Sequence, residues 1–381
     1  MIEILLTVSV LLSSAVYFVF LLSIIRGLKL IKCSPPNNQS VVNPFISVII
    51  PCRNEAQNIP GNIADLLVQN YPRDLFEVIF VDDHSEDSTA AIVLSYTKSD
   101  SRIRLLTMKD STRGLSGKKQ AIAYGIEHTK GEIIVTTDAD CRYSSTWLTT
   151  IAGYFDDETG FLSGPVTFHQ NKGFFQSMQV VEFAGLVLAG AGLIGLSHPT
   201  ICNGANIAYR KSLFYQVNGF ADNHGLSSGD DELVMRKIHK LGTYRVKFAA
   251  NAGATVLTDA AKTLGEFLNQ RARWASKGLY YNKLFVLLGL IPFFLFFLSL
   301  LVLPILGVLF REYYFLLFLI LFCIKGLIEF AILRQGKAFL GTKVRFAEFF
   351  LAQTLHPLYI VVASFLGTFK SYTWKERVIK H

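Results

Sequence analysis

Acidic side chains recur in this chain where apolar, β-branched stretches end. The pairs concerned are Asp82 with Asp83, Asp138 with Asp140, and Asp230 with Asp231. The first two pairs close an apolar stretch, and the third precedes a helix-prone segment, 232–241. Carboxylates at strand ends lie where an open α/β sheet places its ligand site. Such groups can hold a divalent cation, accept hydrogen bonds from a ribose or a base edge, or take a proton from a hydroxyl.

The pair Asp138 and Asp140 gives the strongest indication of a metal site. Two carboxylates two residues apart supply hard oxygen ligands. Mg²⁺ or Mn²⁺ typically takes one or two of these together with phosphate oxygens and water. Two acidic residues at this spacing are common by chance, so it is their position directly after a β-branched strand that favours a metal site.

Two further groups of residues suit a nucleotide. Asp82 and Asp83 can accept hydrogen bonds from a ribose or a base, and Glu55 follows the preceding apolar strand. Helix capping near Asp83 is the competing interpretation. Lys118 and Lys119 follow Ser-Gly at the start of a predicted helix, where N–H groups and cations suit a phosphate or a uracil carbonyl. A solvated basic loop explains the two lysines equally well.

The remaining candidates suit an acceptor. Asp231 or Asp230 is a candidate general base, although a carboxylate at a helix start is usually a cap. Gln270, Arg273 and Trp274 have i, i+3, i+4 spacing and therefore share one helix face. That face could stabilise a leaving diphosphate and stack an acceptor ring, or it could be an interfacial aromatic and basic belt.

Alternating strands and helices must position these residues. Strand patterns occur at 45–52, 77–83, 102–108 and 132–138, and helical patterns lie between them at 56–69, 85–96 and 118–128. This rhythm predicts an α/β fold with a mostly parallel sheet covered on both faces. The apolar, glycine-rich segment 174–196 is long enough to cross a membrane. Gln176, Gln179 and Glu182 in its first turns favour instead a helix and loop buried in the soluble domain.

The composition indicates a membrane protein. Of 381 residues, 51% are hydrophobic and 17% are charged, which is too apolar for an ordinary soluble enzyme. Runs long enough to cross a bilayer lie at 4–25, 284–310, 313–333 and 349–369, the last weakened by Gln353, His356 and Pro357. The first run lacks the positive start and the cleavage site of a signal peptide. We therefore expect a transmembrane helix within 1–30, an α/β domain over 44–281, and two to three transmembrane helices over 284–369.

Charge placement predicts the orientation and the partners. Arg26, Lys29 and Lys32 follow the first run, which puts the central domain in the cytoplasm. A full crossing by the fourth run would leave Lys370 and Lys375 outside, so that run is re-entrant or interfacial, or the tail breaks the rule. The net charge of +8 comes largely from juxtamembrane residues, which favours membrane lipids over nucleic acid as a partner. Five scattered cysteines predict neither a disulfide framework nor a zinc site.

Taken together, the motifs resemble those of the family 2 glycosyltransferases, in the membrane-integrated branch that includes cellulose, hyaluronan and poly-N-acetylglucosamine synthases and ceramide glucosyltransferase. They occur in that family's order over 45–278: SVIIPCRNE, VDDHSED, GKKQA, DADC, NGANIAYRKSLF, GDDEL and QRARW. The resemblance implies a catalytic domain of the GT-A fold, over 44–281, flanked by transmembrane helices.

The resemblance also implies the role of each motif. It implies nucleotide contacts at Asp82 and Asp83, a metal and diphosphate site at Asp138 and Asp140, a base at Asp231 or Asp230, and an acceptor and diphosphate site at Gln270, Arg273 and Trp274. The family's usual Glu-Asp before the base helix is Asp-Asp in this chain, which leaves open which aspartate is the base.

The enzyme that these roles imply is an inverting, metal-dependent glycosyltransferase on the cytoplasmic face of a membrane. It would transfer a sugar from a nucleotide sugar, expected to be a UDP-sugar, to a lipid or glycan acceptor. A processive synthase of a β-linked polysaccharide is the alternative. A non-catalytic, nucleotide-binding transporter or scaffold is a more remote alternative. A transporter would need polar or ionised residues along several spans, and the apolar runs contain few of these: Lys325, Glu329, Gln353 and His356.

Overall fold

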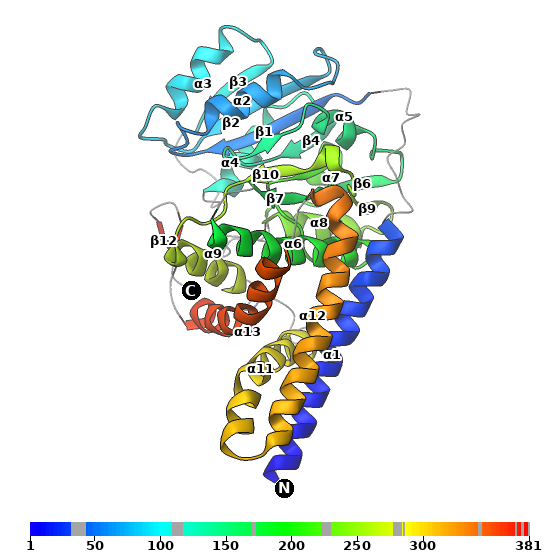
Figure 1. Ribbon diagram of the computed structural model, residues 1–381. Coiled ribbons are helices and arrows are strands. Elements are labelled where there is room, and N and C mark those ends of the chain that lie inside the picture. Colours follow the sequence, from blue (N-terminus) through cyan, green and yellow to red (C-terminus); the bar gives the residue numbers. More distant parts are fainter. Residues whose placement is uncertain are drawn as a thin grey trace.

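The strands predicted from the sequence lie side by side in a seven-stranded sheet in the computed structural model of the chain (Figure 1). The structure describes residues 1–31, 43–108, 117–169, 173–221, 230–276, 284, 286–341, 345–369, 372–374 and 377–379. The sheet has the order β3-β2-β1-β4-β8-β6-β9. Its strands are β1 (Ile46–Cys52), β2 (Phe76–Asp82), β3 (Ile103–Thr107), β4 (Ile133–Thr136), β6 (Thr159–Ser163), β8 (Ile207–Arg210) and β9 (Arg245–Phe248).

The sheet is mostly parallel. Strand β1 runs parallel to β2 and β4, β2 runs parallel to β3, and β6 runs parallel to β9. Only β8 is antiparallel to its neighbours, β4 and β6. The predicted α/β fold is therefore confirmed. Every residue of β2 is buried, as an apolar parallel strand requires when helices cover both faces of the sheet.

Helices cover the two faces of the sheet and form two apolar cores. Ile50 and Phe80 face a core completed by α2 (Ile59–Leu67), α3 (Thr89–Thr97) and α5 (Trp147–Ala152). Ile49 and Val81 face the opposite core, which α4 (Lys118–Glu127) and the membrane-side helices complete. The remaining helices of this part are α6 (Phe174–Gly195), α7 (Lys211–Gln216), α8 (Asp230–Lys240), the short 3₁₀ helix η1 (Ala252–Ala254) and α9 (Leu264–Ser276).

Two small sheets lie outside the regions where the sequence predicts strands. One has the order β5-β10-β7, with β5 (Arg142–Tyr143), β10 (Val256–Thr258) and β7 (Val166–Phe168). The other pairs β11 (Tyr372–Trp374) with β12 (Arg377–Ile379). Strands of two or three residues are too short to show a hydrophobic period, so the sequence could not predict them.

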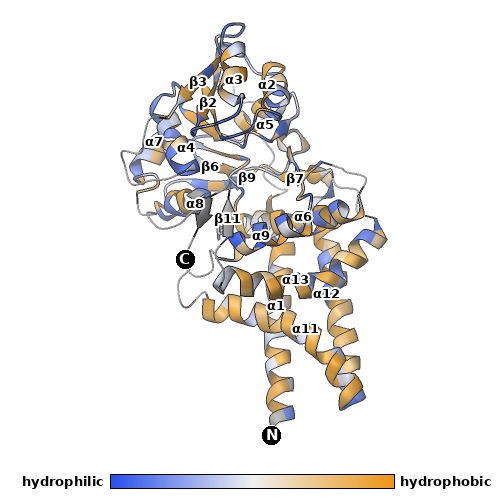
Figure 2. Ribbon diagram, turned by 90° about the vertical axis from the view of Figure 1, so that its left-hand side faces the viewer, coloured by the Kyte–Doolittle hydropathy of each residue, from blue (hydrophilic) through white to orange (hydrophobic). Residues whose placement is uncertain are grey.

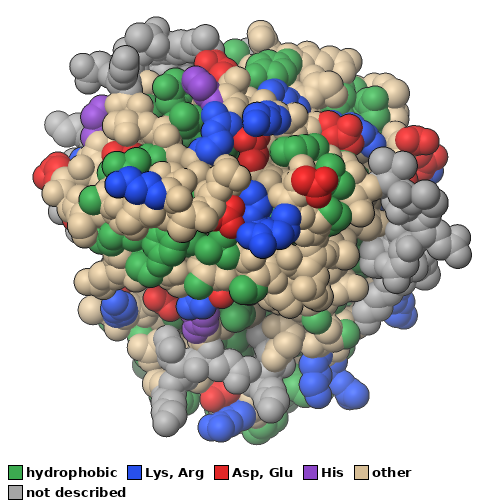
Figure 3. Space-filling model, turned by 90° about the horizontal axis from the view of Figure 1, so that it is seen from above, with side chains coloured by type: hydrophobic (Ala, Val, Ile, Leu, Met, Phe, Trp, Pro, Cys, Tyr) green, Lys and Arg blue, Asp and Glu red, His purple; other side chains and the backbone are tan. Residues whose placement is uncertain are grey.

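The apolar runs form long helices below the sheet. These are α1 (Ile2–Ile31), α11 (Ile291–Leu309), which continues the short π-helix η3 (Val286–Leu290), α12 (Glu312–Leu340) and α13 (Phe346–Phe369). Within the described residues, five helices are long and apolar enough to cross a membrane: these four and α6. In Figure 2 the ribbon of this lower part is mostly coloured as hydrophobic, whereas the upper face in Figure 3 carries interspersed acidic and basic side chains.

Helix α13 lies across the direction of α1 and α12, alongside α6 and α9 (Figures 1 and 2). By length and composition alone this helix, formed by the fourth apolar run, could also cross a membrane. Lys370 and Lys375, on which the topology argument depends, lie outside the described residues.

Helix α6 joins the sheet to the membrane helices. It lies beneath the sheet and packs against α1, α12 and α13, and its described side chains contribute to the core on that side of the sheet (Figure 1). Its crossing with α1 depends on glycine. A Cβ on Gly27 would lie 1.9 Å from the carbonyl oxygen of Gly192, so the two backbones are in direct contact.

A polar cluster ties α1, α12 and α13 together inside the apolar bundle. The Lys325 ammonium is fully buried, contacts Gln353, and lies 3.1 Å from Glu329 Oε2 and 3.3 Å from His356 Nδ1. The Tyr17 hydroxyl donates to Glu329 Oε1 at 2.6 Å. The polar residues noted in the apolar runs therefore pair with one another.

Candidate active site

A cavity of about 450 Å³ lies between the ends of β1 and β4 on one side and helices α6, α8 and α9 on the other. Most of the residues singled out from the sequence form its wall: Glu55, Asp83, Lys118, Asp138, Asp140, Asp231, Gln270, Arg273 and Trp274. Asp82 and Lys119 are buried and lie outside the wall. The side chain of Asp230 lies outside the described residues.

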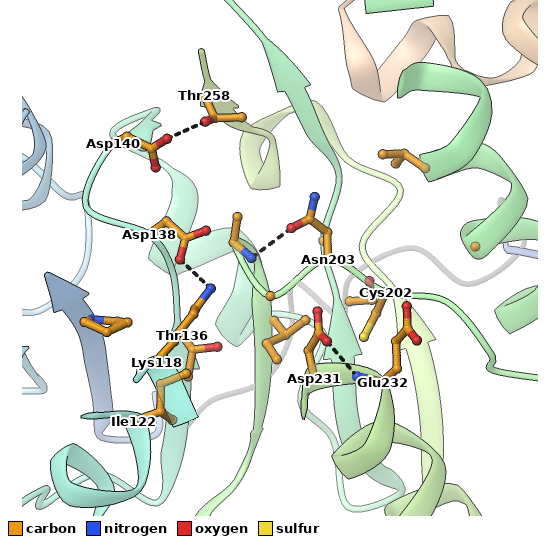
Figure 4. A pocket seen from close by; sticks show the side chains of 18 of the residues that line it. Lys118, Ile122, Thr136, Asp138, Asp140, Cys202, Asn203, Asp231, Glu232 and Thr258 are labelled. Atoms are coloured by element: carbon orange, nitrogen blue, oxygen red, sulfur yellow. Dashed lines mark hydrogen bonds and ion pairs between the residues drawn. The ribbon is translucent and has the colours of Figure 1, made fainter. Parts of the chain in front are cut away.

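Asp138 and Asp140 occupy the β4 side of the cavity (Figure 4). Asp138 Oδ1 lies 2.5 Å from the Lys118 ammonium, and Asp140 Oδ2 accepts a hydrogen bond from Thr258 Oγ1 at 3.0 Å. Burial, followed by the charges of Asp138 and Glu55, raises the pKa of the Asp140 carboxyl to about 6. The two carboxylates are thus close enough to affect each other, and this donor set of carboxylate oxygens fits a hard divalent cation.

The loop after β1 is held in place by the loop after β2. The Glu55 N–H donates to Thr89 Oγ1 at 2.8 Å, and the Glu86 N–H donates to Asn54 Oδ1 at 2.9 Å. Asn54 has a left-handed backbone, with φ of 53°, which a residue other than glycine keeps only where its surroundings hold it. These bonds fix Glu55 in the cavity wall.

The two aspartates that end β2 have different surroundings. Asp83 reaches the cavity, and its Oδ1 lies 3.1 Å from His84 Nδ1. Asp82 is 3% exposed, and its Oδ1 has no hydrogen-bond partner within the described residues. Of the two aspartates, Asp83 is therefore the one that a ligand in the cavity would contact.

Lys118 reaches the cavity from the first turn of α4. Gly117 precedes it with φ of 61°, a conformation that glycine adopts without strain, and this turn starts the helix. Lys119 points elsewhere, since it is 4% exposed and lies outside the wall. Of the two lysines, the structure therefore brings Lys118 to the carboxylates.

The opposite wall carries a second acidic group on α8. Asp231 lies in the first turn of α8 and accepts a hydrogen bond from the Glu232 N–H at 3.0 Å, as Figure 4 shows. Its carboxylate lies close to Gly204, where an added Cβ would be 3.1 Å from Asp231 Oδ2. Glu232, which the sequence did not single out, is 4% exposed and also lines the cavity.

Helix α9 forms a further part of the cavity wall, through the helix face that the sequence singled out. Gln270, Arg273 and Trp274 all reach the wall, so their helical spacing does bring them to one site. The ring of Trp274 stacks on Phe183 of α6 with 5.9 Å between ring centroids. Helix α6 adds a largely apolar stretch of wall: Phe183, Leu186, Val187, Gly190 and Ala191.

Two supporting residues were not predicted. Thr258, which binds Asp140, lies on a three-residue strand 118 residues further along the chain. Asn206 lies in the NGAN motif and is 1% exposed, and its side chain is hydrogen-bonded to three separate segments of the chain. It accepts from Trp147 Nε1 at 3.2 Å and donates to the carbonyl oxygens of Pro165 and Ala254, each at 2.8 Å. The sequence does contain a signal for Asn206, because an asparagine in an otherwise apolar stretch indicates a buried polar side chain that needs hydrogen-bond partners.

The chain matches known protein families over most of this region. Residues 47–217 match the family described as Glycosyl transferase family 2, and residues 133–329 match Glycosyl transferase family group 2. The second match covers half of the chain and includes most of the cavity wall.

Individual relatives agree with these matches. The glycosyltransferase AglE of Haloferax volcanii is 28% identical over 234 residues, which are 60% of this chain and 71% of AglE. The poly-β-1,6-N-acetyl-D-glucosamine synthase of Staphylococcus epidermidis is 25% identical over 238 residues, 61% of this chain and 54% of that protein. The matched part is thus only about half of the synthase.

Among solved structures, the mannosyltransferase PcManGT from Pyrobaculum calidifontis, in complex with GDP-Man and Mn²⁺, superimposes with a TM-score of 0.58. It is 20% identical, with 96% of this chain and 99% of that chain covered. At this identity the likeness concerns the fold, and it confirms the arrangement of a GT-A sheet with flanking apolar helices.

Proposed function

Because this chain belongs to glycosyl transferase family 2, and is therefore an enzyme that uses a nucleotide sugar, we propose that it transfers the sugar with inversion to a hydroxyl of a lipid or glycan acceptor at the cytoplasmic face of a membrane. The expected donor is a UDP-sugar. One observation carries the proposal: Asp138 and Asp140 line the same cavity as Asp231 and the α9 face, but from the opposite side.

Asp138 and Asp140 would hold Mg²⁺ or Mn²⁺, which when bound offsets the negative charge of the diphosphate leaving group. The burial of Asp140 and its closeness to the charges of Asp138 and Glu55, which together raise the pKa of Asp140, support this assignment. So does the Mn²⁺ and GDP-Man complex of PcManGT. Lys118, at 2.5 Å from Asp138, would contact phosphate oxygens, while Asp83 and Glu55 would bind the nucleoside.

Asp231 is the proposed general base. Its carboxylate would take the proton of the acceptor hydroxyl as the hydroxyl oxygen forms the new bond to the anomeric carbon and the nucleoside diphosphate leaves from the opposite side. Single displacement of this kind inverts the anomeric centre. Support for Asp231 comes from its position in the cavity wall, and Asp230 remains the alternative base.

A lipid acceptor is favoured for this chain. The apolar wall supplied by α6, and the contact of α6 and α9 with α13, would let an acceptor with an acyl or polyprenyl chain reach the cavity from the bilayer. The division expected from the sequence, with a transmembrane helix in 1–30, a catalytic domain over 44–281 and a membrane region over 284–369, is part of the proposal. A processive synthase would place a growing glycan against Trp274 instead.

A donor screen followed by product mass tests the proposal. Purified full-length protein in detergent is heated with UDP-, GDP- and CMP-sugars, with and without Mn²⁺, and the unfolding temperature is recorded. We expect one class of donor to stabilise the protein, in a metal-dependent way. Incubation of that radiolabelled donor with lipid extract should then give a product that carries one sugar. A ladder of products would support the processive alternative, and neither stabilisation nor transfer with any donor would contradict the proposal.

A further inference from the structure

A buried ion pair lies directly behind the α9 face of the cavity. Arg271 of α9 is 4% exposed and pairs with Glu182 of α6, its Nε donating to Glu182 Oε1 at 3.1 Å and its Nη2 to Glu182 Oε2. The pair is bidentate, so the guanidinium plane is fixed relative to α6. Neither residue lines the cavity, and neither has a role in the proposed chemistry.

The pair determines which atoms of Gln270 face the cavity. Arg271 Nη1 lies 2.6 Å from the side-chain oxygen of Gln270. A guanidinium has only donors, so the Gln270 atom that it contacts must be the amide oxygen. The amide N–H₂ group is then the part of Gln270 left to donate hydrogen bonds to a substrate oxygen in the cavity.

The same guanidinium supports the indole of Trp274. Arg271 Cζ lies 4.2 Å from the centroid of the Trp274 ring and 4.5 Å from that of Phe267. The Trp274 ring also stacks on Phe183. Held between a fixed cation and a second ring, the indole keeps one orientation in the cavity wall.

We propose that Arg271 and Glu182 are positioning residues for the acceptor: the pair aims the amide donors of Gln270 and the ring of Trp274 into the cavity from α9. This inference rests on the proposed function for the identity of the ligand that the two side chains meet. The acceptor must then have an oxygen that accepts a hydrogen bond from the Gln270 amide, and an apolar surface or a sugar ring that packs on Trp274.

Lysine cannot replace arginine in this arrangement. Its ammonium can keep the charge pairing with Glu182, but it lacks the planar fork that binds a carboxylate and an amide oxygen at once and stacks on an indole. Arg271→Lys should therefore fold, yet lose the orientation of Gln270 and Trp274. A purely structural ion pair would tolerate the same change.

The kinetic test uses full-length protein in nanodiscs with the donor and acceptor found in the screen. Arg271→Lys and Arg271→Met should each raise the KM for the acceptor about tenfold, the effect of one lost charge-assisted hydrogen bond, and leave the KM for the donor unchanged. The control is Arg104→Met, which breaks a partly buried arginine–glutamate pair away from the cavity, with Arg104 Nη1 2.7 Å from Glu77 Oε2. It should leave the acceptor KM unchanged.

A second readout needs no activity. The chain has three tryptophans, so the emission of Trp274 is obtained as the difference between each protein and its Trp274→Phe counterpart. Quenching of that emission by acrylamide should increase in both Arg271 variants and stay unchanged in Arg104→Met. If the acceptor KM or the quenching of Arg271→Lys equals that of the wild type, the positioning role is wrong. A wild-type protein that transfers no sugar would refute the proposed function, while the quenching would still decide whether the pair orients Trp274.

Discussion

Carboxylates on the two sides of the cavity have surroundings that suit different tasks. Asp140 lies among other acids, accepts from Thr258 and has a raised pKa, whereas Asp231 begins a helix on the far wall and faces Gly204. The first environment suits a cation, because added positive charge relieves the repulsion. The second suits a base that must meet an acceptor hydroxyl.

The identity of the base is tested by a matched pair of neighbouring variants. Asp231→Asn should lower kcat about 10²–10⁴-fold, the usual contribution of a positioned base, with donor binding retained. Asp230→Asn should have a much smaller effect, because a single positioned carboxylate takes the proton of the acceptor hydroxyl. Steady-state kinetics and donor thermal shifts measure both. Equal losses in the two variants would contradict the assignment.

Thr258 gives a test of the metal assignment away from the carboxylates themselves. Thr258→Val removes the hydroxyl that donates to Asp140 at 3.0 Å and keeps the side-chain volume. Losing such a supporting hydrogen bond typically costs about 10–100-fold in metal affinity, so the Mn²⁺ concentration for half-maximal activity should rise. Thr243→Val, on an exposed turn, is the control. An unchanged Mn²⁺ requirement in Thr258→Val would argue against Asp140 as a ligand.

At the scale of elements, the strands that carry Asp83 and Asp138 were predictable, and the elements that support the cavity were not. A short run rich in β-branched residues, such as EVIFVDD, predicts a buried strand. The ends of these predicted strands also indicated the edge of the sheet at which the acidic residues lie. Thr258 and Arg271 acquire their roles from contacts 118 and 89 residues apart, which no local pattern records. The same holds for Asn206, although its motif was visible.

The crossing of α1 with α6 predicts a sharp difference between two glycines. Gly27→Ala places a methyl group against the Gly192 carbonyl, so the helices must separate, at a cost of about 1–3 kcal/mol as for other overpacked contacts. Gly326→Ala on α12 has no atom within 4 Å and should be neutral or stabilising. Thermal unfolding in detergent compares them. Equal stability of the two variants would contradict the close crossing.

At the scale of the whole molecule, the polar cluster around Lys325 holds the helices α1, α12 and α13 of the apolar bundle together. Lys325→Met should destabilise the protein by about 3 kcal/mol or more, because it leaves the Glu329 carboxylate buried without its cation. The double change Lys325→Met with Glu329→Gln removes both charges and keeps an acceptor for Tyr17, so it should recover most of the loss. A double variant no more stable than Lys325→Met would show that the charge pairing is not what matters. The thermal unfolding of the three proteins decides this.

The whole molecule joins the proposed nucleotide-sugar cavity to a set of apolar helices through α6 and α9. In the part of the chain that the structure describes, an α/β sheet is thereby combined with five helices of membrane-spanning length. The expected product is a glycosylated lipid or glycan of the membrane. The proposed transfer depends most on the metal site assigned to Asp138 and Asp140.

The rate of sugar transfer by the Asp138→Asn variant is therefore the most direct test of the proposed metal site. The wild type, Asp138→Asn and the exposed-site control Asp74→Asn are assayed with the same donor, acceptor and Mn²⁺, after thermal unfolding has shown that all three are folded. Asp138→Asn should lose at least about a hundredfold in rate, since stabilisation of the leaving diphosphate is removed. Asp74→Asn should match the wild type. Full activity of folded Asp138→Asn would contradict the account.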